Sequence, residues 1–205
     1  MTHTLHRKSN PEGPQDDFVM LIMAGLDRMQ HEIVRERMDE IWDILSHYEA
    51  GLANYGTIRG GGREKPIPEL KQRTPWIIHA VFSSLERLQS CLRELQSRDL
   101  GISVAVSGCN EAVGKACDEL GLSPHTVQYS LGIHGKCEKL PGEDTLAIAT
   151  MCGHAMVSKN LIAHMIERIA AGKMTHAEGA SKLSRMCDCG VFNKHKAERL
   201  LKQII

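Results

Sequence analysis

The sequence predicts an α/β (α+β) protein in which a long N-terminal α-hairpin precedes a small ferredoxin-like β-α-β-β-α unit with extra C-terminal helices. Three observations predict it: apolar residues recur at helical spacing up to residue 99, short apolar runs follow Gly101, and helical spacing returns after about residue 155. We therefore expect a disordered polar tail over residues 1–15, a helical hairpin over 16–99 and an α/β domain over 100–205.

The composition excludes several classes of function. The 205 residues include 25 Lys+Arg and 25 Asp+Glu, and this balance disfavours a broad surface for nucleic acid or anionic membrane. Aromatic residues make up 4%, too few for a base-stacking platform, and no run of about 18 apolar residues predicts a membrane span. The N-terminus lacks the apolar core of a signal peptide, so the seven cysteines predict a reducing compartment, and we expect a cytoplasmic protein.

The first expected helix runs from Asp16 to about Tyr55, with apolar residues three to five apart and charges on the other face. The second begins at Thr74-Pro75, a favourable N-cap and first position, and ends at about Arg98. Methionines recur along the first helix: Met20, Met23, Met29 and Met38. This stripe predicts either a homodimer through the N-terminal helices or a core within one chain.

A glycine-rich segment, Arg59–Lys65, connects the two expected helices. Three glycines flanked by cations are typical of a flexible connector, and their backbone N–H groups could also surround an anion. The segment lacks the Lys-Ser/Thr ending of a phosphate-binding P-loop and follows no predicted strand. A connector is the simpler interpretation.

Short apolar runs after Gly101 predict strands over residues 102–106, 124–131 and 145–150, with one helix from Asn110 to about Leu120. In a split β-α-β unit the first and third of these strands are parallel neighbours. Cys109 and Cys152, which follow those strands, would then meet at one edge of the sheet. Further helices are expected over about 155–171, 175–186 and 193–205, the second of them with a capping-box sequence at Thr175.

Two short cysteine and histidine motifs flank the first two of these C-terminal helices: Met151-Cys152-Gly153-His154 and Cys187-Asp188-Cys189-Gly190. Cys152, Cys187 and Cys189 are the expected metal ligands. With His154 they make a Cys₃His set for tetrahedral zinc, and with Cys109 they make four thiolates for an iron–sulfur cluster. The Cys-x₂₋₄-Cys knuckles of structural zinc sites are absent, which favours the iron–sulfur cluster slightly. Four reduced cysteines in a core are the alternative without metal.

The leading hypothesis is a cytoplasmic metalloprotein, an iron–sulfur or zinc enzyme or a redox-linked accessory protein. A second hypothesis is a non-catalytic ligand-sensing or assembly module whose Cys/His cluster is structural. A third is a metal-free thiol enzyme, with Cys109 as a nucleophile at a helix N-terminus and His125, in preference to His134, as its base. The same edge, with its free backbone amides, would accept a small anionic or thiol-bearing ligand.

Overall fold

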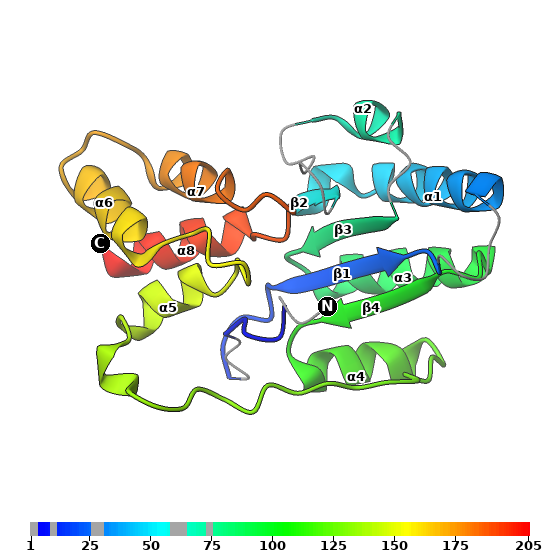
Figure 1. The fold of residues 1–205 in the computed structure, drawn as a ribbon, viewed down its shortest axis with the longest axis horizontal. Helices are drawn as coiled ribbons and strands as arrows, with labels where there is room; N and C mark the ends of the chain where they lie inside the picture. Colours follow the sequence, from blue (N-terminus) through cyan, green and yellow to red (C-terminus); the bar gives the residue numbers. More distant parts are fainter. Residues whose placement is uncertain (1–3, 9–11, 26–30, 58–64, 73–75) are drawn as a thin grey trace.

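A computed structural model describes residues 1–205 except 1–3, 9–11, 26–30, 58–64 and 73–75. The fold is α+β (Figure 1), with a four-stranded antiparallel sheet and, among the described residues, eight α-helices. The strands are β1 (Phe18–Met23), β2 (Leu52–Thr57), β3 (Ile77–Phe82) and β4 (Ser103–Ser107). The helices are α1 (His31–Ser46), α2 (Ile67–Lys71), α3 (Leu85–Arg98), α4 (Asn110–Glu119), α5 (Glu143–Ala149), α6 (Lys159–Ala170), α7 (His176–Ser184) and α8 (Lys194–Ile204).

The sheet unit, residues 18–119, contains the order β1-α1-β2-α2-β3-α3-β4 followed by α4, with the short helix α2 in the connection between β2 and β3. The strand order is β2-β3-β1-β4, with β1 antiparallel to both β3 and β4 and β2 antiparallel to β3. Each β-α-β segment therefore encloses a strand of the other, which is the split β-α-β arrangement. At the centre of the sheet, Val19 lies opposite Val81 on one side and Ser107 on the other.

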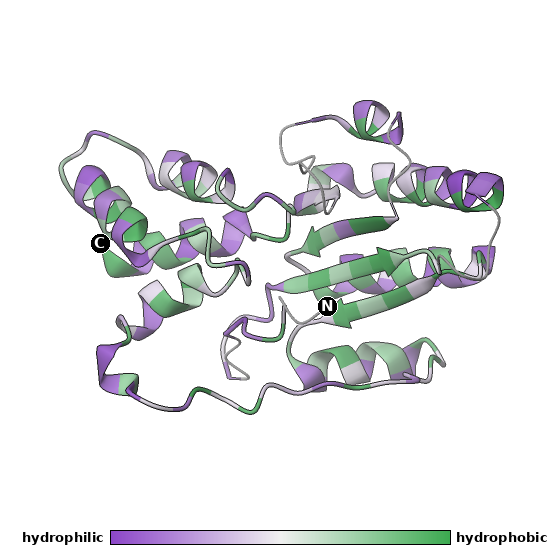
Figure 2. Cartoon of the chain, viewed as in Figure 1, coloured by the Kyte–Doolittle hydropathy of each residue, from purple (hydrophilic) through white to green (hydrophobic). Residues whose placement is uncertain are grey.

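Both faces of β1 are buried, because successive side chains of a strand point to opposite faces. Phe18, Met20 and Ile22 pack into the core formed with α1 and α3, whereas Val19 and Leu21 pack against the C-terminal helices. The strand is accordingly apolar along its whole length, as its continuous green colour in Figure 2 shows.

The expected helix from Asp16 to Tyr55 is wrong, and the N-terminal α-hairpin does not form: strands occupy both ends of that range, and only α1 between them is helical. The six-residue apolar run Phe18–Met23 also satisfies helical spacing, but an uninterrupted run is what a strand buried on both faces requires. The second expected helix is likewise only partly correct. Residues 77–82 form β3, and α3 starts later, where the Ser84 hydroxyl accepts a hydrogen bond from the Arg87 N–H. Its expected start at Thr74-Pro75 lies outside the described residues.

The expected ferredoxin-like unit over residues 102–171 is also wrong in its second half. β4 and α4 confirm the first strand and helix, but residues 124–131 are exposed and have no regular secondary structure. Residues 145–149 belong to α5, whose first turn carries Glu143 and Asp144. Acidic residues at a helix N-terminus and two alanines favour a helix over a strand here.

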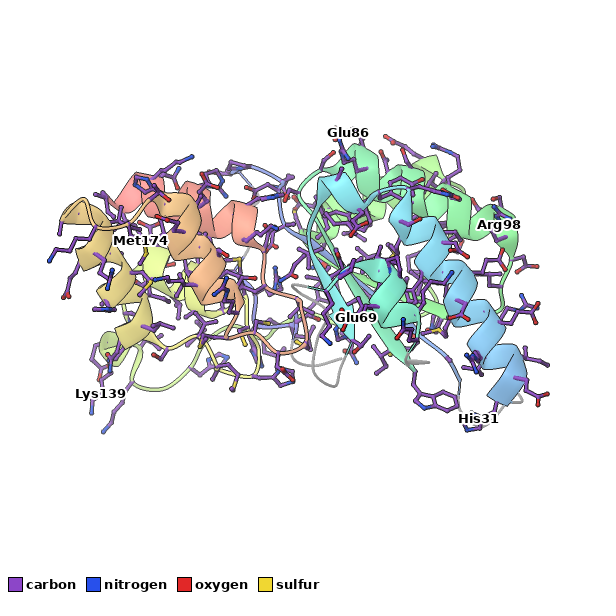
Figure 3. The ribbon with its side chains drawn as sticks, turned by 90° about the horizontal axis from the view of Figure 1, so that it is seen from above. His31, Glu69, Glu86, Arg98, Lys139 and Met174 are labelled. Atoms are coloured by element: carbon purple, nitrogen blue, oxygen red, sulfur yellow. The ribbon has the colours of Figure 1, made fainter. Side chains whose placement is uncertain are left out.

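The helical unit, residues 143–204, packs beside the sheet unit through α8 and β2 (Figures 1 and 3); in Figure 3 Met174 marks the helical unit and Arg98 the sheet unit. The helices expected near 155–171, 175–186 and 193–205 are confirmed as α6, α7 and α8. Thr175 and Glu178 form the predicted capping box at the start of α7. None of the described helices is both long enough and apolar enough to span a bilayer.

The apolar stripe of α1 is covered within the chain. Val34, Met38, Ile41 and Trp42 are buried in the core between α1, α3 and the sheet, together with Met20. Met20 and Met38 of the methionine stripe are thus buried within the chain, Met29 lies outside the described residues, and the homodimer stays a prediction.

Candidate metal centre

The two cysteine and histidine motifs lie in contact with each other and form what we call the Cys/His cluster: Cys152, His154, Cys187 and Cys189. Cys152 and His154 lie between α5 and α6, and the other two lie between α7 and α8. The Sγ atoms of Cys187 and Cys189 are 3.8 Å apart, and the Cys189 Sγ lies 3.7 Å from the His154 Nδ1. Cys152 lies near enough to Cys187 for the two thiols to shift each other's pKa, so interactions link all four residues.

The turn that carries Cys187 and Cys189 depends on the glycine that follows them. Gly190 has a φ of +73°, a conformation that side chains disfavour, and its N–H donates to the Cys187 carbonyl at 3.2 Å. A Cβ atom at Gly190 would lie 2.5 Å from the Tyr55 carbonyl oxygen of β2. A glycine is therefore required for the turn to approach the sheet.

Two polar side chains of the sheet hold this turn. The His79 ring on β3 is fully buried, and its Nδ1 lies 2.7 Å from the Cys189 carbonyl oxygen. Because a carbonyl oxygen can only accept, the Nδ1 must carry the proton and donate it. From β2, the Asn54 amide donates to the Ser184 hydroxyl at 3.0 Å and to the Phe192 carbonyl at 2.9 Å.

The sequence analysis did not single out either residue, and its second expected helix placed His79 in a helix instead of a strand. A usable signal exists in the run Ile77–Phe82, where a single histidine interrupts an otherwise apolar strand. A polar side chain at such a position is buried and must find a hydrogen-bond partner. Its position as an anchor for Cys189 becomes visible only once the strand is assigned.

The three thiols of the cluster and the imidazole of His154 differ in their exposure to solvent. Cys152, Cys187 and Cys189 are 0–2% exposed, whereas His154 lies at the surface. The hydrogen bond to Cys187 and then burial raise the pKa of Cys152. The hydrogen bond from Cys152 lowers the pKa of Cys187, but the bond to Cys189 and burial outweigh it and raise this pKa to about 11. The hydrogen bond from Cys187 outweighs burial and lowers the pKa of Cys189, which is therefore the first cluster thiol to ionise.

The cluster is not closed around a metal ion. In the part of the chain that the structure describes, no group of three or more His, Cys, Asp or Glu side chains is arranged to hold one. The short contacts run from one residue to the next, so binding one ion would require side-chain rotations that draw the four donors together.

An N-terminal strap, residues 4–8, contacts both cluster loops. The Arg7 Nη1 donates to the carbonyl of Met151, the first residue of one cluster motif, at 2.7 Å and to the carbonyl of Val191, which directly follows the other motif, at 2.8 Å. The Arg7 guanidinium also pairs with Asp17 at the start of β1, and 6% of the arginine side chain is exposed. Described residues of the expected disordered tail thus take part in the packing.

The buried carboxylate of Asp17 forms ion pairs with two cationic side chains. Besides Arg7, the Lys196 Nζ lies 3.1 Å from the Asp17 carboxylate, and 9% of the aspartate side chain is exposed. Burial alone raises the pKa of Asp17, but the charges of Arg7 and Lys196 and the hydrogen bonds from Arg7 and Asn193 hold it below its usual value. The carboxylate is therefore ionised at neutral pH.

Cys109 is in a different environment. It is buried at the N-cap of α4 and lines a cavity of about 580 Å³, together with Lys8, Glu143, Asp144 and Lys196. The prediction that Cys109 lies beside Cys152 assumed that residues 145–150 form a strand parallel to the strand that precedes Cys109. Residues 145–149 are helical, so this argument no longer applies.

The remaining expected residues lie away from regular structure. His125 and His134 are exposed in the segment between α4 and α5, where 124–131 form no strand, so the predicted position of His125 at a strand start is wrong. Most of the glycine-rich segment Arg59–Lys65 lies outside the described residues.

Comparison of the chain with protein-family models, with curated proteins and with solved structures found no match.

Proposed function

We propose that this chain is a cytoplasmic metalloprotein that binds one zinc ion through Cys152, Cys187, Cys189 and His154. The observation that carries the proposal is the pair of short contacts that joins Cys187, Cys189 and His154, with the thiol of Cys152 beside Cys187. Tetrahedral zinc with Zn–S bonds of about 2.3 Å and Zn–N bonds of about 2.0 Å separates two sulfur ligands by about 3.8 Å and sulfur from nitrogen by about 3.5 Å. The Cys187–Cys189 and Cys189–His154 separations are 3.8 and 3.7 Å.

An iron–sulfur cluster is the second candidate for the metal. In a [2Fe–2S] cluster each iron holds its own pair of protein ligands, so one pair lies apart from the other. Here Cys187 and Cys189 fit one iron, but Cys152 and His154 each contact a member of that same pair. The short contacts between the pairs favour a single ion.

The surroundings of the cluster favour a structural role for the metal over an open catalytic one. The three thiols are buried, and the loops that carry them are bonded to β2 and β3 through Asn54 and His79. Structural zinc sites are closed by four protein ligands and contribute directly to folding, because the site does not exist in the unfolded chain. Zinc at this cluster would join the two cluster loops of the helical unit, one of which contacts β2 and β3, and would thereby stabilise the surface through which this unit packs on the sheet.

A thiol enzyme built on Cys109 is the second candidate function. The observation that favours it is the position of a buried cysteine at the start of a ten-residue helix, on the wall of a cavity of a size typical of ligand sites. Lys8 and Lys196 on the same wall would attract a small anionic or thiol-bearing ligand. Loss of a thiol-dependent activity in Cys109→Ser, with metal content unchanged, is the expected signature.

Metal analysis of protein purified without oxygen tests the main proposal. We expect one zinc per chain without acid-labile sulfide, and loss of zinc in Cys187→Ser and Cys189→Ser. Cys137→Ser is the matched control, because this thiol is exposed and lies outside the cluster. Iron and acid-labile sulfide in equal amounts would indicate that the site holds an iron–sulfur cluster instead of zinc. Protein without stoichiometric metal, even after reconstitution under reducing conditions, would contradict both forms of the proposal.

A further inference from the structure

We infer that Arg7 is a positioning residue of the Cys/His cluster, and that docking of the N-terminal strap and metal binding favour each other. The inference rests on the proposed metal site and adds a regulatory element to it. Arg7 belongs to neither cluster loop, yet one of its nitrogens bonds to both loops at once. The two loops are otherwise separated in the chain by α6 and α7.

The geometry of the guanidinium explains why an arginine is suited to this position. Nη1 donates to the two loop carbonyls, while Nε and Nη2 bond to the two oxygens of the Asp17 carboxylate. The planar fork of arginine makes these directions available together, whereas the single ammonium of a lysine cannot reach all of them. The two cluster loops are thereby held at a fixed position relative to β1.

Other atoms of the strap extend the same connection. The Thr4 hydroxyl lies 2.8 Å from the Ser107 hydroxyl at the end of β4, and the Lys8 N–H donates to the Thr150 hydroxyl at 3.3 Å. The Lys8 carbonyl accepts a hydrogen bond from the Lys196 Nζ at 2.8 Å. The strap therefore contacts the sheet, the loop that carries Cys152 and helix α8.

Thermodynamic linkage gives this arrangement a consequence. If the docked strap holds the two loops at the separation that metal binding needs, bound metal must stabilise the docked strap by the same free energy. Removing an outer residue that orients metal ligands typically lowers metal affinity by about 10–100-fold. A strap that undocks would release the metal more easily, so its docking can regulate the site.

The first test measures zinc affinity by competition with a chromophoric chelator. We expect Arg7→Gln to lower the affinity by about 10–100-fold and Arg7→Lys to lower it to a smaller extent. Arg199→Gln is the matched control: Arg199 forms a similar two-bond pair with the neighbouring Asp16, at 2.7 and 3.1 Å, but bonds to neither cluster loop. Wild-type affinity in Arg7→Gln, or an equal loss in Arg199→Gln, would overturn the inference.

The second test uses the unaltered chain and so does not depend on the folding of a variant. Trypsin cleaves after Arg7 and Lys8 in the strap and after Lys139, which lies on an exposed segment between α4 and α5 (Figure 3). We expect zinc to slow cleavage in the strap and to leave cleavage at Lys139 unchanged. Equal cleavage of the strap with and without bound zinc would contradict the linkage.

A third measurement separates this inference from the proposed function. In metal-free reduced protein, Arg7→Gln should increase the alkylation rates of Cys152 and Cys189, because their loops are no longer held together. If the wild-type chain binds no metal, the proposed function is wrong. The alkylation rates of Cys152 and Cys189 then decide alone whether Arg7 positions the two loops. Unchanged alkylation rates would then reject the positioning role as well.

Discussion

Around the Cys/His cluster three buried thiols contact one another, whereas Cys109 is a single buried thiol that faces charged side chains across a cavity. Hydrogen bonding with Cys187 lowers the pKa of Cys189 and raises that of Cys152. The neighbours of Cys109 on the cavity wall include Lys8, Glu143 and Lys196.

The difference indicates two kinds of chemistry. Thiols in mutual contact provide several soft donors for one metal ion, and their burial excludes solvent from it. A lone thiol beside charged groups at a helix N-terminus fits a nucleophile or a ligand contact instead. The sequence analysis expected Cys109 beside Cys152 at one edge of the sheet, whereas our proposals assign the Cys/His cluster and Cys109 to two different kinds of chemistry.

The buried ion group between the two environments gives the largest expected effect. Asp17→Asn leaves Arg7 and Lys196 without their counter-charge, and removing one partner of a buried ion pair destabilises a protein by about 3–5 kcal/mol. Asp16→Asn is the control, because its pair with Arg199 is more exposed and should contribute at most about 1 kcal/mol. Urea unfolding measures both. Equal losses would show that Asp17 is no more important than a surface residue.

The same substitution predicts a pH dependence. The pKa of Asp17 is lowered in the folded protein, so its stabilising contribution is fully present above the unfolded value of about 3.9. The contribution is lost as the pH falls through the lower folded pKa, where the folded carboxylate also becomes protonated. We expect the stability difference between wild type and Asp17→Asn to shrink below about pH 4. A constant difference down to pH 2 would contradict the lowered pKa.

A glycine substitution should disturb the cluster and leave Cys109 unaffected. Gly190→Ala combines a left-handed backbone with a Cβ 2.5 Å from the Tyr55 carbonyl oxygen, and we expect a loss of about 2–5 kcal/mol. Gly132→Ala is the control, since its φ is +89° but a Cβ there meets nothing within 4 Å, so about 1–2 kcal/mol should be lost. Thiol mapping should find faster alkylation of Cys187 and Cys189 in Gly190→Ala, and an unchanged rate at Cys109. Faster reaction at all three would show that the two environments are coupled.

Local patterns predicted the C-terminal helices well, because their signals lie within a few residues. Thr175 and Glu178 carry both halves of a capping box, and Gly121, with a φ of +65°, follows α4, which was predicted to end at about Leu120. The pairing of the two cluster motifs was predicted too, since both motifs combine cysteines with glycine at element ends. These features need no knowledge of the rest of the fold.

The predictions that failed depend on contacts between residues far apart in the sequence. A short apolar run such as Phe18–Met23 fits a helix or a strand by spacing alone, and only burial on both faces decides for the strand. The run at 145–150 has the same ambiguity, and residues 145–149 form a helix where a strand was predicted. Arg7 could not be found as a cluster residue, because its partners Met151 and Val191 are backbone carbonyls more than a hundred residues away.

The smallest expected effect is also the most direct test of the separation between the two environments. Cys109→Ala removes one buried sulfur at the N-cap of α4, a position where the side chain makes no capping bond. Deleting a buried group of about methyl size typically lowers stability by about 1 kcal/mol, and urea unfolding can measure this loss. We expect the metal content to stay unchanged in this variant, whereas Cys152→Ala should lose the metal. If Cys109→Ala also loses the metal, Cys109 is a ligand, and the four-thiolate set that the sequence allowed replaces the Cys₃His centre.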